Sequence, residues 1–352
     1  MKKTILIDYR WSKKTGIGRH VDNALPVLIK SFKKIYLLTN QDIDDLYLKN
    51  LKNVELIKIN SKVYSLLEQF EIYFKRPRDY DVCWFPNYNA PIFLKNKIIH
   101  IHDLAHVENF KRNFLKSLYS YFLILINIIF SKKILTVSEF SKKKILGFYP
   151  YLFIKNKVKV IYPGVFNNPV TSLSNKREKI ILSVGTIKKR KNFITLVKAF
   201  SKLANDTFFR DHKLMIVGQK SQLGDLDYEV LKYESEKIIF CGSLSDNELK
   251  NIFAKSELFV FPSLYEGFGI PPIEAMQNGI PVICSDIPVL KEVCKNAVAY
   301  FSPLEENELY KKMKFILKDE KIKKAMIENG LSYYKRYSWK NYNKDLLNEL
   351  KS

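Results

Sequence analysis

Short apolar runs rich in β-branched residues alternate along the chain with segments of helical length. In the first half, these runs predict strands at Thr4–Asp8, Lys34–Leu38, Val54–Ile59, Val82–Phe85, Ile98–His102, Ile134–Val137 and Val158–Ile161. Helices are predicted between several of them, for example at Gly18–Ser31 and Glu139–Leu146. Repetition of strand, helix and strand indicates a mostly parallel sheet covered on both faces.

A second series of the same kind follows the stretch Pro163–Lys179, whose Pro, Gly, Asn and Ser residues without apolar periodicity indicate a linker. Its predicted strands are Ile180–Val184, Lys213–Val217, Ile238–Cys241, Leu258–Phe261 and Pro281–Cys284. Its predicted helices are Asn192–Leu203, Asp246–Ala254 and Pro271–Asn278. Two α/β series of similar size predict two doubly wound Rossmann-like domains, at residues 1–165 and 176–334. The last helical stretch, Tyr333–Leu350, is expected to pack back onto the first domain through residues 335–352.

The length of 352 residues agrees with two domains, and the apolar content of 47% is that of a globular protein. Four scattered cysteines form no C-x-x-C pair, which favours a reducing cytoplasm over a disulfide framework or a zinc site. The opening MKKTILIDYRW predicts a strand and not a signal peptide. The net charge of +23 suits nucleic acid, anionic membrane or small anionic substrates, and its even spread along the chain does not choose among them.

The most apolar segment is residues 117–130, SLYSYFLILINIIF, which has lysines on both sides. A bilayer span needs roughly 18 to 20 apolar residues, so this segment is too short to cross a membrane. A buried helix of the first domain is the favoured interpretation. The alternative is a helix that lies in the bilayer interface, held by aromatic side chains and flanking lysines.

The segment Phe261–Met276, FPSLYEGFGIPPIEAM, leads from a predicted strand into a helix. Pro271 and Pro272 suit the first helical turn, where their missing N–H groups cost nothing. The turn Gly267–Phe268–Gly269 lets the backbone approach a ligand closely, and the free amides of a helix start favour an anion.

Two carboxylates frame this turn, Glu266 before it and Glu274 inside the following helix. A carboxylate accepts hydrogen bonds from neighbouring hydroxyls, such as those of a sugar or a ribose. The segment therefore predicts a site for a ligand that carries both phosphates and sugar hydroxyls.

Four consecutive cations, Lys188 to Lys191, follow the predicted strand Ile180–Val184 within the segment SVGTIKKRKN. Gly185 stands at the strand end, and Arg190 and Lys191 stand next to the start of a helix. Ligands of open α/β sheets bind beyond the carboxyl ends of the strands, so these cations are placed to neutralise a diphosphate.

Two further strand ends carry candidate residues. In the segment IIHIHDLAHV, His102 and Asp103 stand at the end of a predicted buried strand. A histidine at this position can donate to a phosphate or a sugar hydroxyl. His100 and His106 are expected to be structural. TGIGRH, after the first strand, supplies Gly16, Gly18 and Arg19. It lacks the third glycine of the dinucleotide fingerprint, which argues against an NAD enzyme.

Together these motifs resemble the retaining GT-B glycosyltransferases of family 4. The resemblance covers nearly the whole chain in order: TGIGRH, IHDLAH, LTVSEFSKKKI, VIYPGV, SVGTIKKRKN, FCGSLSDNEL, EGFGIPPIEAM and YSWKNY. It implies two Rossmann-like domains facing across a cleft, the first binding the acceptor and the second binding a nucleotide sugar.

The resemblance also implies roles for single residues. Glu266 and the amides of Gly267, Phe268 and Gly269 would lie by the donor sugar, and Glu274 would bind the ribose. Arg190 and Lys191 would face the diphosphate, beside Gly185. His102 would lie near the reacting sugar and act with Glu266 in catalysis, and the stretch at Gly242 and Leu244 would contact the base.

One departure from the family pattern is Thr186, where many members carry an arginine. The form GT-x-x-x-RKN is similar to bacterial mannosyl- and deoxyhexosyl-transferases, in which Arg190 would take over the anion contact. No cofactor and no metal are expected. The acidic pair Asp44–Asp45 would be the candidate for a metal-binding DxD-type motif, but no other motif lies next to it. Lys191, Arg190 and backbone amides would instead stabilise the leaving diphosphate.

The resemblance, together with these residues, implies transfer of a hexose, with retention of configuration, from a GDP-, dTDP- or UDP-linked sugar to a glycan or a polyprenyl-diphosphate-linked acceptor. The acceptor would bind around Gly16–His20, next to Asp103, and along the face of residues 107–130. The enzyme would work at the cytoplasmic side of the inner membrane. The expected pathway is O-antigen or capsule assembly. A nucleotide-sugar epimerase or a sugar phosphorylase of the same fold is the alternative, and the chain has no nucleic-acid-binding motif.

Overall fold

In the computed structural model, the chain divides into two compact units, residues 1–164 with 339–352, and residues 165–338. The structure describes residues 2–12, 16–40, 46–105, 114–149, 154–165, 177–220 and 227–352, without the side chains of residues 46 and 114–117. Most of the predicted linker and the residues Thr15, Asp44, Asp45 and His106 lie outside these ranges.

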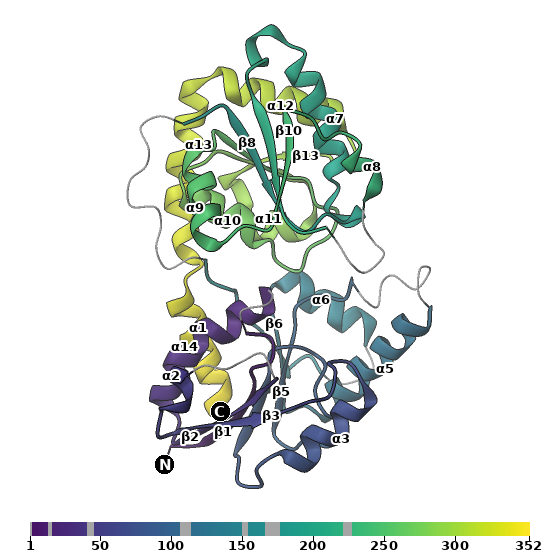
Figure 1. The fold of residues 1–352 in the computed structure, drawn as a ribbon, viewed down its shortest axis with the longest axis vertical. Coiled ribbons are helices and arrows are strands. Elements are labelled where there is room, and N and C mark those ends of the chain that lie inside the picture. Colours follow the sequence, from purple (N-terminus) through teal and green to yellow (C-terminus); the bar gives the residue numbers. More distant parts are fainter. Residues whose placement is uncertain are drawn as a thin grey trace. The chain divides into compact units, whose positions relative to one another are not determined.

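Unit 1 is a parallel sheet of seven strands in the order β3-β2-β1-β4-β5-β6-β7 (Figure 1). The strands are β1 Thr4–Asp8, β2 Lys34–Thr39, β3 Val54–Lys58, β4 Val82–Phe85, β5 Lys97–Ile101, β6 Lys133–Thr136 and β7 Val158–Val160. The helices are α1 Gly16–Ser31, α2 Leu46–Lys49, α3 Leu66–Lys75, α5 Phe114–Phe130, α6 Glu139–Phe148 and α14 Trp339–Lys351.

The sheet of unit 1 is covered on both faces, as its near-continuous apolar strands require. Along β1, Ile5 and Ile7 join the core on one face, whereas Leu6 joins the core on the other. The helix α14 contributes Trp339, Tyr342, Leu346 and Leu350 to the first of these cores. It lies beside α1, and Asn343 Nδ2 donates to the carbonyl of Asn23 at 3.0 Å (Figure 1).

Unit 2 is a parallel sheet of six strands in the order β10-β9-β8-β11-β12-β13. The strands are β8 Ile180–Val184, β9 Lys213–Val217, β10 Ile238–Gly242, β11 Leu258–Phe261, β12 Val282–Ser285 and β13 Ala299–Phe301. The α-helices are α7 Phe193–Ala204, α8 Tyr228–Leu231, α9 Asp246–Lys255, α10 Ile270–Gln277, α11 Pro288–Cys294, α12 Glu306–Lys318 and α13 Glu320–Tyr333. Short 3₁₀ turns stand at η1 Lys189–Lys191, η2 Thr207–Phe209, η3 Lys295–Ala297 and η4 Tyr334–Arg336.

The order of strands reverses at one point in each sheet, between β1 and β4 and between β8 and β11. Such switch points place the loops after the two central strands on opposite sides of a crevice at the carboxyl edge, where open α/β sheets bind ligands. In unit 2 these are the loops that carry the cation run and the glutamate motif.

The last helical stretch, predicted at roughly Tyr333–Leu350, is interrupted in the structure. The helix α13 ends at Tyr333, and α14 begins only at Trp339. Tyr337 between them is not helical, and its hydroxyl donates to the carbonyl of Val293 at 2.8 Å. Its carbonyl accepts from the N–H of Val165 at 3.3 Å, so backbone pairing with a distant segment replaces the helix here.

Candidate functional site

The Lys191 side chain connects the loops after β8 and β11. Its Nζ donates to Oε1 of Glu266 at 2.5 Å and lies 5.2 Å from the centre of the Phe261 ring. Gly185 lies against the lysine stem, where a Cβ would stand at the ordinary van der Waals distance of 3.5 Å from Cδ and Cε of Lys191. The strand-end glycine and the two charged residues that the sequence singled out therefore meet in one place.

Glu266 is buried and has a second partner that the sequence did not indicate. Ser263 Oγ donates to the same oxygen, Oε1, at 2.6 Å. Two backbone contacts add to this connection: the N–H of Leu264 donates to the carbonyl of Arg190 at 2.9 Å, and Nη1 of Arg190 donates to the carbonyl of Tyr265 at 3.5 Å. The cation loop and the glutamate loop thus form one hydrogen-bonded structure.

Asn192 fixes the turn between η1 and α7. Its backbone is left-handed, with φ at 55°, a conformation that asparagine adopts more readily than most residues. Its buried Nδ2 donates to the carbonyls of Pro262, at 3.0 Å, and Pro303, at 2.6 Å, while Oδ1 accepts from Thr195 Oγ1 at 2.8 Å. This turn sets the direction in which Lys191 leaves the backbone.

The helix α10 starts at the glutamate motif with Pro271 and Pro272 in its first turn, as predicted. Gly269 is its N-cap with φ at 96°, and a Cβ there would come within 2.7 Å of Leu290 Cδ2. Glu274 lies on α10 and is only 2% exposed. The structure thus places a buried carboxylate on the helix that follows the Glu266 loop.

Three glycines meet at the ends of β8, β9 and β10. The N–H of Gly185 donates to the carbonyl of Val217 at 2.9 Å, and the N–H of Gly218 donates to the carbonyl of Gly242 at 2.8 Å. Gly242 has a positive φ of 65°, and Leu244 two residues later is half-buried. Gly218 was not identified from the sequence, although its position directly after a strand was a usable signal.

The candidates of unit 1 gather at α1 and the end of β5. Gly16, Gly18 and Arg19 form the first turn of α1, and Oδ1 of Asp103 accepts from the N–H of Ala105 at 3.0 Å. His102 is partly exposed, and its Nε2 is 2.8 Å from the carbonyl of Pro86.

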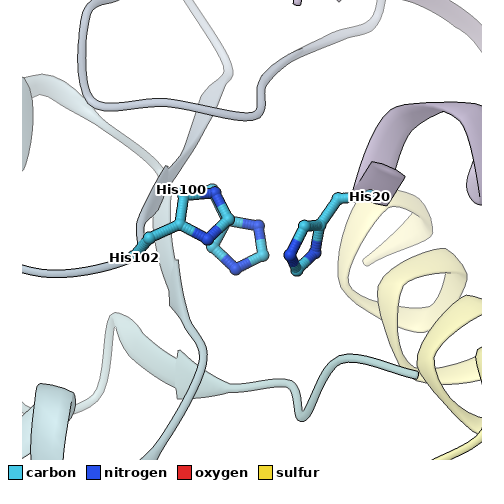
Figure 2. Close-up of side chains that lie close together, drawn as sticks. All are labelled: His20, His100 and His102. Carbon is cyan, nitrogen blue, oxygen red and sulfur yellow. The ribbon is translucent and has the colours of Figure 1, made fainter. Parts of the chain in front are cut away.

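His20, His100 and His102 form a cluster that the sequence did not indicate, since His100 was expected to be structural. The ring centroid of His20 lies 5.3 Å from that of His100 and 4.7 Å from that of His102. The rings of His100 and His102 are stacked at 4.4 Å, and Figure 2 shows His20 on α1 turned toward both. One ring nitrogen from each residue lies within 4.8 Å of the other two.

A buried charged network at the end of β1 was also missed. Arg10 donates to Asp8 through Nε at 2.7 Å and to Glu68 on α3 through Nη2 at 2.6 Å. Asn89 Nδ2 donates to both oxygens of Glu68 at 3.1 Å. Burial lowers the pKa of Arg10, but the charges of Asp8 and Glu68 outweigh burial and raise it, so the guanidinium remains charged.

The apolar segment 117–130 belongs to α5, which is buried along one face only. Leu123, Ile124 and Ile128 lie in the core, whereas Phe122 and Phe130 are exposed. Among the described residues, no helix is long and apolar enough to cross a bilayer.

The two parallel-sheet units have the architecture of the GT-B fold. WaaG, a glycosyltransferase involved in lipopolysaccharide biosynthesis, has this architecture with a TM-score of 0.77 at 16% identity, over 99% of both chains. Anabaena HepE, solved with UDP-glucose, gives a TM-score of 0.78 at 16% identity, also over 99% of both chains.

Residues 166–333 match the family of glycosyl transferases group 1. The O-antigen chain mannosyltransferase RfbU of Salmonella typhimurium is 32% identical over 249 residues, which cover 70% of this chain and 67% of that protein. The O-antigen chain mannosyltransferase B of Escherichia coli is 27% identical over 284 residues, covering 76% and 73%. The chain belongs to the glycosyl transferases group 1 family, which confirms the resemblance and the fold class predicted from its motifs.

Proposed function

We propose that this glycosyltransferase moves a hexose, mannose or a deoxyhexose such as rhamnose, from a nucleoside-diphosphate sugar to a glycan or a polyprenyl-diphosphate-linked acceptor in O-antigen or capsule assembly. The observation that carries the proposal is the junction of Lys191, Glu266 and Ser263 at the switch point of unit 2. The O-antigen mannosyltransferases among the relatives support mannose and a surface polysaccharide.

The cationic side of this junction binds the diphosphate. The Lys191 ammonium has three N–H donors. One donates to Glu266, and the other two can donate to phosphate oxygens. Arg190 and the amides of Gly267–Gly269 add donors on the same side. Fixed donors of this kind stabilise the charge that develops on the leaving diphosphate, so the proposed transfer uses no metal.

The acidic side of the junction binds hydroxyls. Both side-chain hydrogen bonds to Glu266 fall on Oε1, which leaves Oε2 to accept from the donor sugar. Glu274 on α10 accepts from the ribose, and the turn at Gly242 and Leu244 contacts the base. Transfer proceeds with retention of the anomeric configuration.

Unit 1 binds the acceptor around Gly16, Gly18, Arg19 and Asp103, and His102 acts close to the reacting sugar. The acceptor is held at an anionic membrane surface. The helix α3 supports this part of the proposal, because Leu66, Leu67, Phe70 and Phe74 expose an apolar face, with Phe74 78% exposed. The exposed basic residues nearby in sequence are Lys62, Lys75, Arg78 and Lys95. An apolar face with basic flanks suits the interface of an anionic bilayer.

A radiolabel transfer assay tests the donor and the acceptor together. GDP-mannose, dTDP-rhamnose and UDP-glucose are offered with a short-chain polyprenyl-diphosphate-linked oligosaccharide. One donor is expected to give a labelled lipid product with retained configuration, and Lys191→Ala is expected to slow its formation by about 10²- to 10³-fold. Lys189→Ala is the matched control, because Lys189 lies in the same run but is exposed. Release of free sugar with no lipid product from any donor would contradict the proposed acceptor.

Vesicle sedimentation tests the membrane surface separately. The double variant Phe70→Ser with Phe74→Ser is expected to lose binding to phosphatidylglycerol vesicles. Phe315→Ser, at a phenylalanine of unit 2 whose exposure lies between those of Phe70 and Phe74, is expected to keep it. Equal binding of all three proteins would remove α3 from the proposal and leave the donor site unaffected.

A further inference from the structure

The histidine cluster of unit 1 contains an unusual concentration of buried polar atoms without partners. Nδ1 of His20 and both ring nitrogens of His100 have no hydrogen-bond partner among the described residues. His100 is fully buried. Leaving a buried donor or acceptor unpaired costs about 1–3 kcal/mol, so each such atom calls for a partner such as a water or an ion.

The third histidine is already held in the manner of a metal ligand. Nε2 of His102 lies 2.8 Å from the carbonyl of Pro86, and because a carbonyl can only accept, Nε2 carries the proton. Nδ1 of His102 therefore has a free lone pair. Metal-bound histidines commonly donate their second N–H to a backbone carbonyl, which fixes both tautomer and orientation.

We propose that His20, His100 and His102 form a binding site for one transition-metal ion, and that Zn²⁺ suits it best. Three imidazoles are a known zinc ligand set that leaves a fourth position open, whereas Mg²⁺ and Ca²⁺ require oxygen ligands. His20 comes from α1, His100 from β5 and His102 from the segment directly after β5, so a bound ion connects the first helix to the end of this strand (Figure 2).

Binding requires a small movement of the rings. Zinc–nitrogen bonds of about 2.1 Å place two tetrahedral ligands about 3.4 Å apart, so nitrogens now within 4.8 Å must approach by up to about 1.4 Å. Rotation of the stacked His100 and His102 rings supplies this movement. Trp339 and Tyr342 of α14 pack edge-on against His20, at 5.6 and 5.1 Å, and provide the apolar surroundings that keep water from the ion.

The ion would also inhibit the enzyme. This consequence depends on the proposed function, in which His102 acts close to the reacting sugar. A metal on Nδ1 of His102 holds that ring away from the substrate. The transfer reaction would then fall with added Zn²⁺ and recover with EDTA.

Direct metal binding to tag-free, EDTA-treated protein tests the site without any sugar substrate. Titration with Co²⁺ is expected to give the visible absorption of a tetrahedral nitrogen site at one equivalent, and Zn²⁺ is expected to displace it. His20→Gln and His100→Gln are each expected to weaken Zn²⁺ binding at least about tenfold. His212→Gln is the matched control, because His212 is buried but bound to Glu257 in unit 2.

The proposed site is overturned if the wild-type protein binds neither Co²⁺ nor Zn²⁺. It is also overturned if the wild-type, His20→Gln and His100→Gln proteins bind Zn²⁺ with equal affinity. A sulfur-to-cobalt charge-transfer band would place the ion on a cysteine and also overturns it. Because the titration contains no donor or acceptor, failure of the proposed transferase activity leaves its result unchanged. Conversely, binding of Zn²⁺ without inhibition supports the site and contradicts the role of His102 in transfer.

Discussion

Lys191 and Glu266 are 75 positions apart in the chain, yet Nζ of the lysine lies 2.5 Å from Oε1 of the glutamate. The two side chains come from the loops after β8 and β11, the adjacent strands at which the strand order of unit 2 reverses. Both are largely buried, with about a tenth of each side chain exposed. Removing one partner of a buried pair leaves the other charge uncompensated, so the pair holds both groups in place before the donor arrives.

Replacing either member of this pair is expected to reduce catalysis more than donor binding. Lys191→Ala should lower kcat/KM by about 10²- to 10³-fold, the usual cost of removing one group that stabilises a developing negative charge. Glu266→Gln should lower it by a similar factor, because the amide loses the charge that aligns Lys191. Steady-state kinetics with the best donor measure both effects.

The double variant of Lys191→Ala and Glu266→Gln tests whether the two residues act as a unit. Since each single change already breaks the contact, the combined loss should be clearly smaller than the product of the two single losses. Additive losses in this double-mutant cycle would show that the residues contribute independently. Lys188→Ala in the same cation run should stay within about threefold of the wild-type value.

Glu274→Gln is expected to change donor affinity and to leave the chemical step nearly unchanged. A hydrogen bond to a charged group contributes about 1.5–3 kcal/mol, which corresponds to about a 10- to 150-fold increase in KM for the donor. Titration with the nucleoside diphosphate alone should show the same loss. Glu328→Gln, at an exposed site on α13, serves as control. A fall in kcat at unchanged KM would remove Glu274 from the ribose contact.

Gly218→Ala is expected to destabilise unit 2 and to disturb the donor site together. The new Cβ would lie 2.0 Å from the carbonyl oxygen of Gly185, so the end of β8 would have to move. Forced overpacking of this kind costs about 1–3 kcal/mol, and Gly185 is the residue against which Lys191 packs. Urea unfolding and nucleotide titration should both show the loss.

Gly147→Ala is the matched control for this substitution. Gly147 lies in α6, and a Cβ there meets no atom within 4 Å. Alanine is the better helix former, so this variant should gain about 0.5–1 kcal/mol of stability. A Gly218→Ala protein as stable as the wild type would mean that the ends of β8 and β9 adapt to the methyl group.

The location of Lys191, Glu266 and Gly185 at one edge of the sheet could be predicted from the sequence, because parallel strands place their carboxyl ends at the same edge. The adjacency of β8 and β11 could not, since strand order depends on packing over the whole unit. Ser263 and Asn192 were missed for a related reason. Their roles rest on hydrogen bonds to residues far along the chain, which leave no periodic signal.

The helix α3 shows a second limit of sequence patterns. It buries Glu68 and Gln69 beside Ile72 and exposes Leu67 and Phe70, so its buried face is more polar than expected for a helix on a sheet. Glu68 is buried because it meets Arg10, a partner 58 positions away. His20 and His100 were missed in the same way, because only the packing of α1 on the sheet brings them together.

Glu71 on α3 gives a pH-dependent contribution to stability. Burial raises its pKa, but hydrogen bonds from Lys75, the Ser61 hydroxyl, and the N–H groups of Asn60 and Ser61 outweigh burial and lower the pKa to about 2. Because the folded value lies below the ordinary value of 4.5, the stabilisation is complete above about pH 4.5 and is lost as the pH falls toward 2. Glu71→Gln removes the titrating group and should cost about 1–3 kcal/mol at pH 7.

The expected signature is a difference that depends on pH. Urea unfolding of wild-type and Glu71→Gln protein should differ by a constant amount between pH 7 and pH 5.5 and by clearly less at pH 3.5, because the wild-type glutamate loses its advantage as the unfolded chain takes up a proton. Glu55→Gln, which removes an exposed ion pair with Lys34, should change stability by less than about 1 kcal/mol at every pH. A Glu71→Gln difference independent of pH would mean that the hydrogen-bond geometry at residues 60–61, and not the charge of the carboxylate, supplies the stabilisation.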